Sequence, residues 1–155
     1  MAGHTDNSVI INAPLDFVWK RLNDVENWPT LFSEYAKAEI LERKDDRTFT
    51  FRLTMHPDPK SGGQVWSWVS ERTVNPETHT TKSHRIETGP FEYMNIDWYF
   101  EPVDGSTKFR IVQDFAVKPT APRNDKQTEE YLNENSAEQF KVIKERLEKE
   151  SAQSS

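Results

Sequence analysis

Between residues 47 and 117 the apolar side chains of this chain recur at every second position, in segments separated by short turn sequences. Such alternation is typical of β-strands with one buried face. Gly89-Pro90 and Asp104-Gly105 are turn sequences, and short turns join antiparallel neighbours, whereas parallel strands need long crossovers. The pattern therefore predicts an antiparallel meander. Its strands are expected at 47–54, 64–74, 80–88, 92–101 and 107–117, with a Pro/Gly-rich loop at 56–63.

Helical patterns flank this meander. A short strand at 7–12 precedes Pro14, which suits the first turn of a helix because its missing N–H has no partner to lose there. Residues 24–32 predict a short, irregular helical connector, and residues 127–150 predict a long amphipathic helix. The first helix is expected to bury Leu15, Val18, Trp19 and Leu22, and the last to turn Leu132, Ser136, Gln139, Ile143 and Leu147 to one face.

A curved sheet whose open face is closed by one long helix is the economical way to bury this pattern. The sequence thus predicts an α+β fold in which an antiparallel sheet of about six to seven strands wraps around a long C-terminal helix. Two short helices follow the first strand, and an internal cavity lies between sheet and helix. Residues 1–150 are expected to form a single domain, and 151–155 a disordered tail.

Charge and composition exclude several classes of function. The net charge of −6 argues against a binder of nucleic acid or of anionic membranes. The absence of cysteine excludes disulfides, thiolate catalysis and cysteine-ligated metals, and the four histidines lack metal-ligand spacing. Since no apolar run approaches the roughly 20 residues that span a bilayer and no signal peptide is evident, we expect a cytoplasmic protein. As a separate expectation, the protein is a monomer or weak dimer.

Aromatic residues make up an unusual share of the apolar side chains, 12% of the chain against 34% hydrophobic residues in all. They either fill an ordinary core or line a cavity for a flat or polyunsaturated ligand. The segment 64–73 bears on this choice, because strand periodicity places Trp66, Trp68, Ser70 and Arg72 on one face. Either this face is interior, so that Arg72 meets a ligand or a partner, or it is an outer face where Arg72 covers the indoles.

Further polar residues stand among rings elsewhere. Arg85 lies in a predicted strand, Trp98 shares a strand face with Met94, and Gln113 shares one with two apolar neighbours. Asn135 and Gln139 are four residues apart on the long helix, so they look the same way. A Ser83–His84 catalytic pair is not expected, because adjacent strand residues point to opposite faces.

With these motifs the chain resembles the single-domain polyketide aromatase/cyclases of the helix-grip superfamily, which includes START-type lipid-transfer domains and the Bet v 1-like birch-pollen allergen. The opening segment, with the pattern I-x-A-P-x-x-x-V-W, indicates the fold. The run W-S-W-x-S-x-R, with the E-Y-x-K-A-E-I-L segment upstream, is more specific and is similar to the enzymes of tetracenomycin and actinomycete spore-pigment biosynthesis.

This resemblance implies an enzyme that folds a poly-β-ketone and closes its first ring by aldol condensation, between the ninth and fourteenth carbons, before dehydration. It implies no cofactor, and as partners an acyl carrier protein and a minimal polyketide synthase. The alternatives are a non-catalytic carrier of lipids or quinones and a co-chaperone-like interaction domain of the same fold. Catalytic roles are implied for Arg72, Ser70 and Tyr35, and pocket roles for Trp28, Phe32, Trp66, Trp68, Arg85, Phe91, Met94, Trp98, Gln113 and Asn135.

Overall fold

Seven antiparallel strands form one curved sheet in the computed structural model, which describes residues 2–59 and 62–154. Strands β2 to β7 pair in chain order and β1 pairs with β7, so β1 and β2 are the two edges of an open sheet. The predicted meander is therefore confirmed. The strands are β1 (Gly3–Ile11), β2 (Tyr35–Arg43), β3 (Thr48–Met55), β4 (Ser67–Asn75), β5 (Thr80–Arg85), β6 (Phe91–Val103) and β7 (Ser106–Val117).

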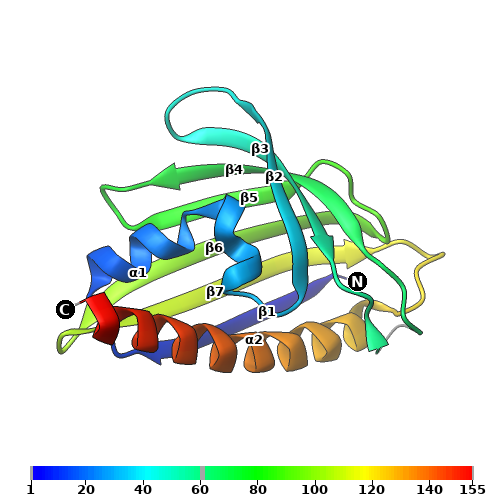
Figure 1. Ribbon diagram of the computed structural model, residues 1–155. Coiled ribbons are helices and arrows are strands. Elements are labelled where there is room, and N and C mark those ends of the chain that lie inside the picture. The colour runs from blue at the N-terminus through cyan, green and yellow to red at the C-terminus, as the bar shows by residue number, and fades with distance from the viewer. Residues whose placement is uncertain (1, 60–61, 155) are drawn as a thin grey trace.

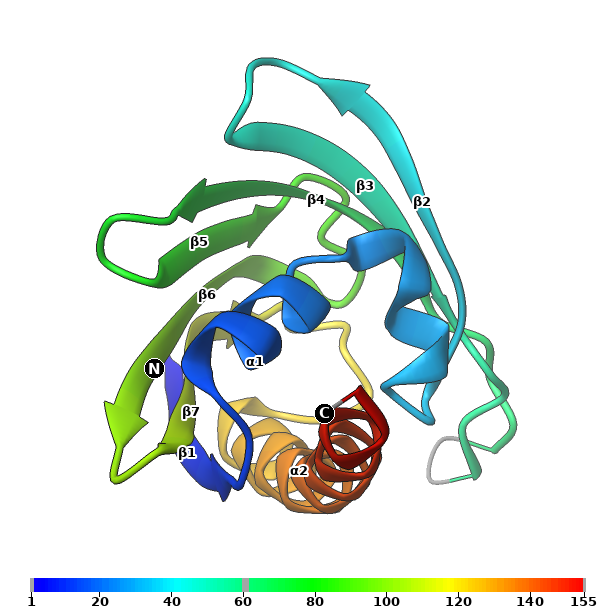
Figure 2. The ribbon, with the colours of Figure 1, turned by 60° about the vertical axis from the view of Figure 1, so that its left-hand side comes forward.

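Three helical segments lie on the concave side of this sheet (Figures 1 and 2). They are α1 (Leu15–Leu22), the short 3-10 helix η1 (Val25–Thr30) and the long C-terminal helix α2 (Asp125–Ser154). Figure 2 shows the sheet curling around α1 and η1, with α2 running across its open side. The predicted α+β architecture, with two short helices after the first strand and one long helix at the end, is confirmed.

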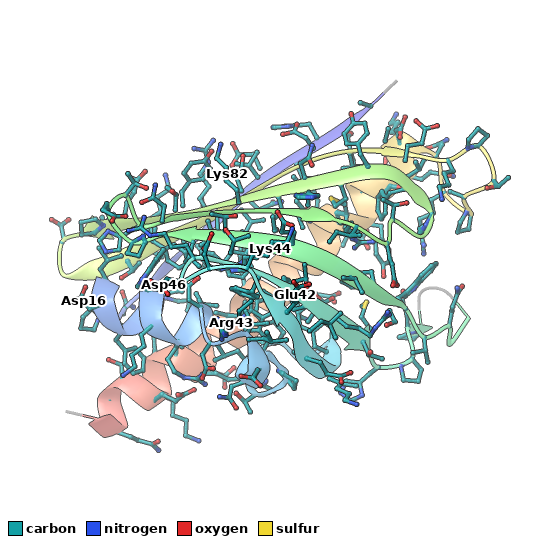
Figure 3. The ribbon with its side chains drawn as sticks, turned by 90° about the horizontal axis from the view of Figure 1, so that it is seen from above. Asp16, Glu42, Arg43, Lys44, Asp46 and Lys82 are labelled. Atoms are coloured by element: carbon teal, nitrogen blue, oxygen red, sulfur yellow. The ribbon has the colours of Figure 1, made fainter. Side chains whose placement is uncertain are left out.

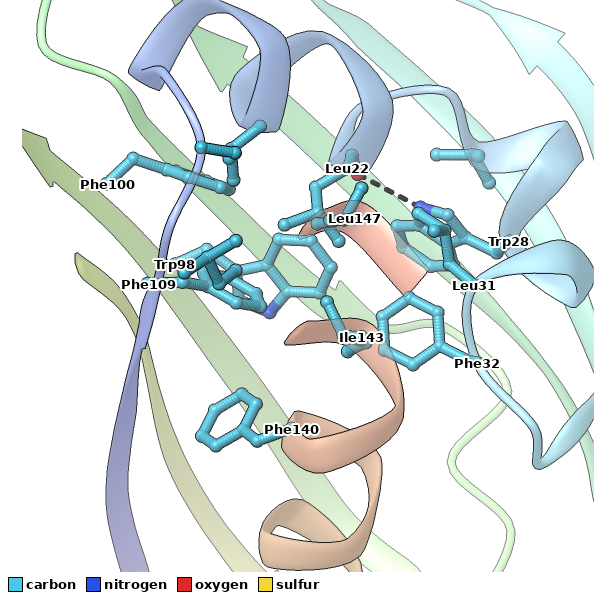
Figure 4. Packing of buried hydrophobic residues seen from close by; sticks show 14 of the residues in the cluster. Leu22, Trp28, Leu31, Phe32, Trp98, Phe100, Phe109, Phe140, Ile143 and Leu147 are labelled. Atoms are coloured by element: carbon cyan, nitrogen blue, oxygen red, sulfur yellow. Dashed lines mark hydrogen bonds between the residues drawn. The ribbon is translucent and has the colours of Figure 1, made fainter. Parts of the chain in front are cut away.

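An apolar core fills the end of this interior where α1 meets the C-terminal half of α2 (Figure 4). Leu22, Phe109, Ile143 and Leu147 have no exposed surface. The indole Nε1 of Trp28 donates a hydrogen bond to the carbonyl oxygen of Leu22 at 3.0 Å, which ties η1 to the end of α1. Burial of these side chains, each worth about 1.5–3 kcal/mol, holds the helices against the sheet.

Strand β2 is the element that the alternation did not predict. Register shifts between Tyr35 and Lys37 and between Ile40 and Glu42 mark two β-bulges against β3. Each bulge inserts a residue and reverses the side-chain alternation beyond it, so no regular period-two pattern is left to detect. Two other strands are shorter than expected, since β4 begins at Ser67 and β5 ends at Arg85.

The predicted tail and loop show different outcomes. Residues 151–154 continue α2, so the prediction of a disordered tail there is wrong, and Ser155 lies outside the described residues. The loop at 56–63 is present where it is described, with residues 60 and 61 outside the described part. Gly62 and Gly63 both adopt positive φ angles, 69° and 83°, which glycine tolerates without a Cβ clash, and Gly63 N–H donates to the Asp58 carbonyl.

Charged side chains gather on the outside of the fold, among them Glu42, Lys44 and Lys82 (Figure 3). This is the polar face that an antiparallel sheet presents when its other face is buried. Among the helices of the described residues, none combines the length and the apolar character that a membrane span requires.

Candidate functional site

A cavity of ≈ 240 Å³ lies between the concave face of the sheet and residues 128–143 of α2. Strands β3 to β7 supply one wall, and η1 with the turn before β2 supplies another. The wall formed by α2 consists of Thr128, Tyr131, Leu132, Asn135, Ser136, Gln139, Phe140 and Ile143. The interior is thus divided between a packed end and a hollow end, and the predicted cavity is present.

The predicted site residues converge on this cavity with a single exception. Met94 is 1% exposed and packs with Phe91 and Phe115 in a separate small cluster, so its predicted place in the pocket lining is wrong. Trp66 lines the cavity although it precedes β4. The others that line it are Trp28, Phe32, Tyr35, Trp68, Ser70, Arg72, Arg85, Phe91, Trp98, Gln113 and Asn135.

Arg72 lies inside the fold, so the outer-face alternative for this segment is wrong. Its side chain is 1% exposed, and its guanidinium carbon is 4.3 Å from the ring centre of Trp98 and 5.2 Å from that of Trp28. Nη2 donates to the side-chain oxygen of Asn23 at 2.9 Å, while Nε has no hydrogen-bond partner among the described residues. Burial lowers the pKa of Arg72 to about 9. A buried cation with a vacant donor is poised for an anionic or strongly polar ligand atom.

Arg85 is a second cation on the same wall. It lies opposite Ser70 in the β4–β5 register, and its guanidinium carbon is 4.1 Å from the ring centre of Trp68 and 4.7 Å from that of Phe91. Its Nε is buried and finds no hydrogen-bond partner in the part of the chain that the structure describes, and burial lowers the pKa of Arg85 to about 10. Both arginines therefore lie over indole rings with one donor left open.

Stacked rings surround the first arginine. Trp28 lies between Trp98 and Tyr35, with ring centres 5.4 Å and 6.1 Å away and interplanar angles of 28° and 24°. Phe32 packs beside Tyr35, with ring centres 5.0 Å apart. Burial raises the pKa of the Tyr35 hydroxyl well above its ordinary value, so this phenol is a hydrogen-bond donor at neutral pH.

Polar side chains fix the other walls of the cavity. Gln113 accepts a hydrogen bond from the Thr5 hydroxyl at 2.8 Å, which links β7 to β1. Gln139 of α2 accepts from the Ser33 amide and donates to the Ser33 hydroxyl, both at 2.9 Å. These bonds join segments more than 100 residues apart, and they hold α2 against the turn that precedes β2.

Sequence reasoning missed the titratable lining residues Glu34, Arg123 and Tyr131, as well as the Arg72 partner Asn23. None of them lies in a strand whose alternation marks an inner face: Glu34 is in a turn, and Asn23 caps the end of α1. Tyr131 is one turn before Asn135 on α2, so helical spacing from that residue was a signal that pointed to it.

The tyrosine of α2 closes one side of the cavity. Its hydroxyl donates to the carboxylate of Asp58 at 2.5 Å, and the Arg123 guanidinium carbon lies 4.2 Å from its ring centre. Burial raises the pKa of Tyr131 to about 12, and the hydrogen bond to Asp58 acts in the same direction. No group of three or more acidic or histidine residues suited to a metal ion occurs in the described part of the chain.

Comparison with known proteins agrees with this geometry. Residues 11–135 match the family described as "Polyketide cyclase / dehydrase and lipid transport". A protein of Streptomyces cyaneus named as a polyketide cyclase is 52% identical over 148 residues, which cover 96% of this chain and 95% of that one.

Two solved structures share the fold. The Zhui aromatase/cyclase of Streptomyces sp. R1128 has a TM-score of 0.79 at 21% identity and covers 98% of this chain and 94% of its own. A START superfamily protein of Mycobacterium smegmatis has a TM-score of 0.72 at 17% identity, covering 98% of this chain and 99% of its own. The fold is the helix-grip fold of these proteins, and the chain belongs to the polyketide cyclase/dehydrase and lipid transport family.

Proposed function

We propose that this protein folds a linear poly-β-ketone in its cavity, closes the first ring by an intramolecular aldol reaction and assists the loss of water that makes the ring aromatic. The observation that carries the proposal is Arg72, a buried cation with an open donor between the rings of Trp28 and Trp98. A carrier of neutral lipids has no use for such a group, because burying an unpaired charge lowers stability.

Arg72 acts on the oxygen on which negative charge develops. Aldol closure passes through an enolate and then an alkoxide, and a fixed cation in a water-poor site stabilises such oxyanions by roughly 3–4 kcal/mol. An arginine pKa of about 9 still leaves the guanidinium charged at neutral pH, so its role is electrostatic. Ser70, 4% exposed beside Arg72 on β4, is placed to orient a ketone oxygen, and the Tyr35 hydroxyl to donate a proton.

The rings select the conformation that reacts. A free poly-β-ketone has many rotatable bonds and closes into several different rings, so holding one near-attack conformer is a large part of the task. The flat walls formed by Trp28, Trp68 and Trp98 suit a chain of conjugated enols, which stack on aromatic faces. Fixing the chain before reaction favours one ring over the others.

The finer features of the proposal rest on the family resemblance. The substrate arrives on an acyl carrier protein of a minimal polyketide synthase, the first ring joins the ninth and fourteenth carbons, and no cofactor takes part. The product belongs to an aromatic polyketide, such as a spore pigment. Because carrier proteins are acidic, docking needs local positive charge; Lys118, Arg123 and Lys126, in the segment that leads from β7 into α2, are the candidates.

Product analysis tests the proposal. A minimal polyketide synthase is run with and without the protein, and the aromatic products are separated and identified. We expect one product with a C9–C14 first ring in place of the mixture that forms spontaneously. If the protein leaves the mixture unchanged yet binds aromatic polyketides in calorimetry, it is a carrier and the enzymatic proposal is wrong.

A further inference from the structure

The aldol reaction also requires a base, and the cavity offers few. The titratable side chains among the described residues that line it are three arginines, two tyrosines and one carboxyl group: Arg72, Arg85, Arg123, Tyr35, Tyr131 and Glu34. The arginines are cations, and burial raises the pKa of both tyrosines. Glu34 is therefore the one group of this described lining that accepts a proton near neutral pH.

The backbone around Glu34 is fixed on both sides. Its carbonyl oxygen accepts a hydrogen bond from the His56 amide at 2.9 Å, which ties the turn to the end of β3. The preceding residue, Ser33, is held by two hydrogen bonds to Gln139 of α2. The Glu34 side chain is partly buried and shares the cavity wall with Tyr35. A base carried on such a fixed turn keeps its position during reaction.

The surroundings of Glu34 place charge of both signs beside it. The Tyr35 hydroxyl and the Arg85 guanidinium both lie near enough to the Glu34 carboxylate to favour its ionised form. Two other carboxylates oppose the ionisation of Glu34: Asp58, in the loop that follows β3, and Glu138, on α2. Burial outweighs the favourable contacts and raises the pKa of Glu34 to about 7.

We propose that Glu34 is the general base that removes the proton from the methylene carbon of the bound poly-β-ketone, an inference that rests on the proposed function. The residue lies in the cavity itself, directly beside the phenol of Tyr35. Methylene groups between two ketones are acidic for carbon acids, so a carboxylate of this kind is strong enough for the transfer when the enolate oxygen is stabilised.

The proton is returned within the same site. The Glu34 carboxylate takes a proton from carbon as the C–H electron pair becomes the enolate. The enolate carbon then forms a bond with a ketone carbon, whose oxygen becomes an alkoxide near Arg72. Tyr35 gives its proton to the alkoxide and recovers one from the neighbouring Glu34 carboxylic acid. The balance is one C–H bond and one C=O π bond broken, one C–C bond and one O–H bond formed, with both side chains restored.

Deuterium exchange tests this step apart from ring closure. Benzoylacetone, a flat 1,3-diketone too short to cyclise, is incubated with the protein in deuterated buffer, and loss of its methylene signal is followed by NMR. We expect the wild-type protein to accelerate exchange over buffer. Glu34→Gln should lose about 100-fold of this acceleration, within the range for removal of a general base. Glu42→Gln, an exposed glutamate on β2, is the matched control and should exchange at the wild-type rate.

The pH profile supplies a readout that a merely structural role would not move. Wild-type exchange should rise with pH through a midpoint near 7, as Glu34 loses its proton, and this limb should vanish in Glu34→Gln. Glu138→Gln removes a neighbouring carboxylate and should move the midpoint to lower pH. The inference would be overturned if Glu34→Gln exchanged the methylene protons at the wild-type rate with the wild-type pH midpoint. It would also be overturned if the wild-type protein did not accelerate exchange. If the wild-type protein accelerates exchange as expected, yet its addition to the synthase leaves the polyketide products unchanged, the proposed function is wrong instead.

Discussion

The two ends of the interior are built on the same sheet and the same helix, yet they differ in kind. At the packed end, Leu22, Phe109 and Leu147 have no exposed surface, and they meet between α1 and the C-terminal half of α2. At the hollow end, Arg72 and Arg85 line a cavity whose helical wall is residues 128–143 of α2. The first end gives apolar burial, and the second contains cations with open donors.

The packed end stabilises the fold, whereas the features of the hollow end lower its stability. A buried arginine with no carboxylate partner among the described residues lowers stability, and side chains that line a cavity make fewer dispersion contacts than those of a packed core. Continuous packing at the other end offsets both, and Trp98 links the ends, since it contacts Phe109 on one side and Arg72 on the other. Substitutions at the two ends should therefore separate activity from stability.

The largest effect is expected for Arg72. Arg72→Ala should fold but lose the authentic cyclised product, by about 100-fold or more, because the oxyanion is no longer stabilised. Arg72→Lys should rescue little, since the planar guanidinium stacked on Trp98 is lost. Product yield from the reconstituted synthase and thermal unfolding are measured together. Arg72→Met, which removes the buried charge, should melt at or above the wild-type temperature. Wild-type product yield from any of the three would contradict the assignment.

A smaller change is expected when a ring of the hollow end is reduced. Trp68→Leu or Trp98→Leu should yield a mixture of shunt products with different first rings, because a looser cavity admits several conformers of the chain. Chromatographic product profiles provide the measurement. One unchanged product at lower yield would show that these rings contribute only to stability.

Leu147→Ala is the matched substitution at the packed end. It should lower the free energy of unfolding by about 2–5 kcal/mol, as for other large-to-small changes in a core. The protein that remains folded should give the wild-type product profile, because Leu147 lies in the core rather than in the cavity lining. An altered profile would mean that the two ends are coupled.

The smallest effect concerns pH and stability at Glu34. Its pKa is about 7 in the fold against 4.5 in an unfolded chain, so the folded state holds an extra proton between these values. Stability due to this group is therefore present below pH 4.5 and is lost as the pH rises through 7. Glu34→Gln should be more stable than wild type by about 1–3 kcal/mol at pH 8, and the difference should disappear near pH 4.5. An equal difference at both pH values would contradict this account.

Much of the fold follows from local patterns in the chain. Alternation in 64–74 is enough to put Trp68, Ser70 and Arg72 on one face, and helical spacing is enough to align Gln139, Ile143 and Leu147. Where a local period breaks, prediction failed. Two bulges hid β2, and the polar composition of 151–154 concealed the last turn of α2.

Candidate site residues followed the same division. Residues on regular strands were placed correctly in the cavity wall, whereas Met94 shares the β6 strand with Trp98 but packs into a separate cluster with Phe115. Strand periodicity assigns a face, and it does not say how far along a curved sheet the cavity extends. Glu34 and Asn23 lie in a turn and at a helix end, where no period exists to assign a direction.

The amino-acid sequence by itself determined the order of the elements other than β2, the antiparallel meander and the shared strand face of Trp68, Ser70 and Arg72, because these depend on contacts and periods within a few residues. The tertiary structure alone decided which face of β4 is interior, where the cavity ends, and that Glu34 meets Tyr35 and Arg85 within it. Those features depend on how α2 docks against segments about 100 residues away, as in the Ser33–Gln139 hydrogen bonds. Such docking is a property of packing over the whole chain, and no local pattern encodes it.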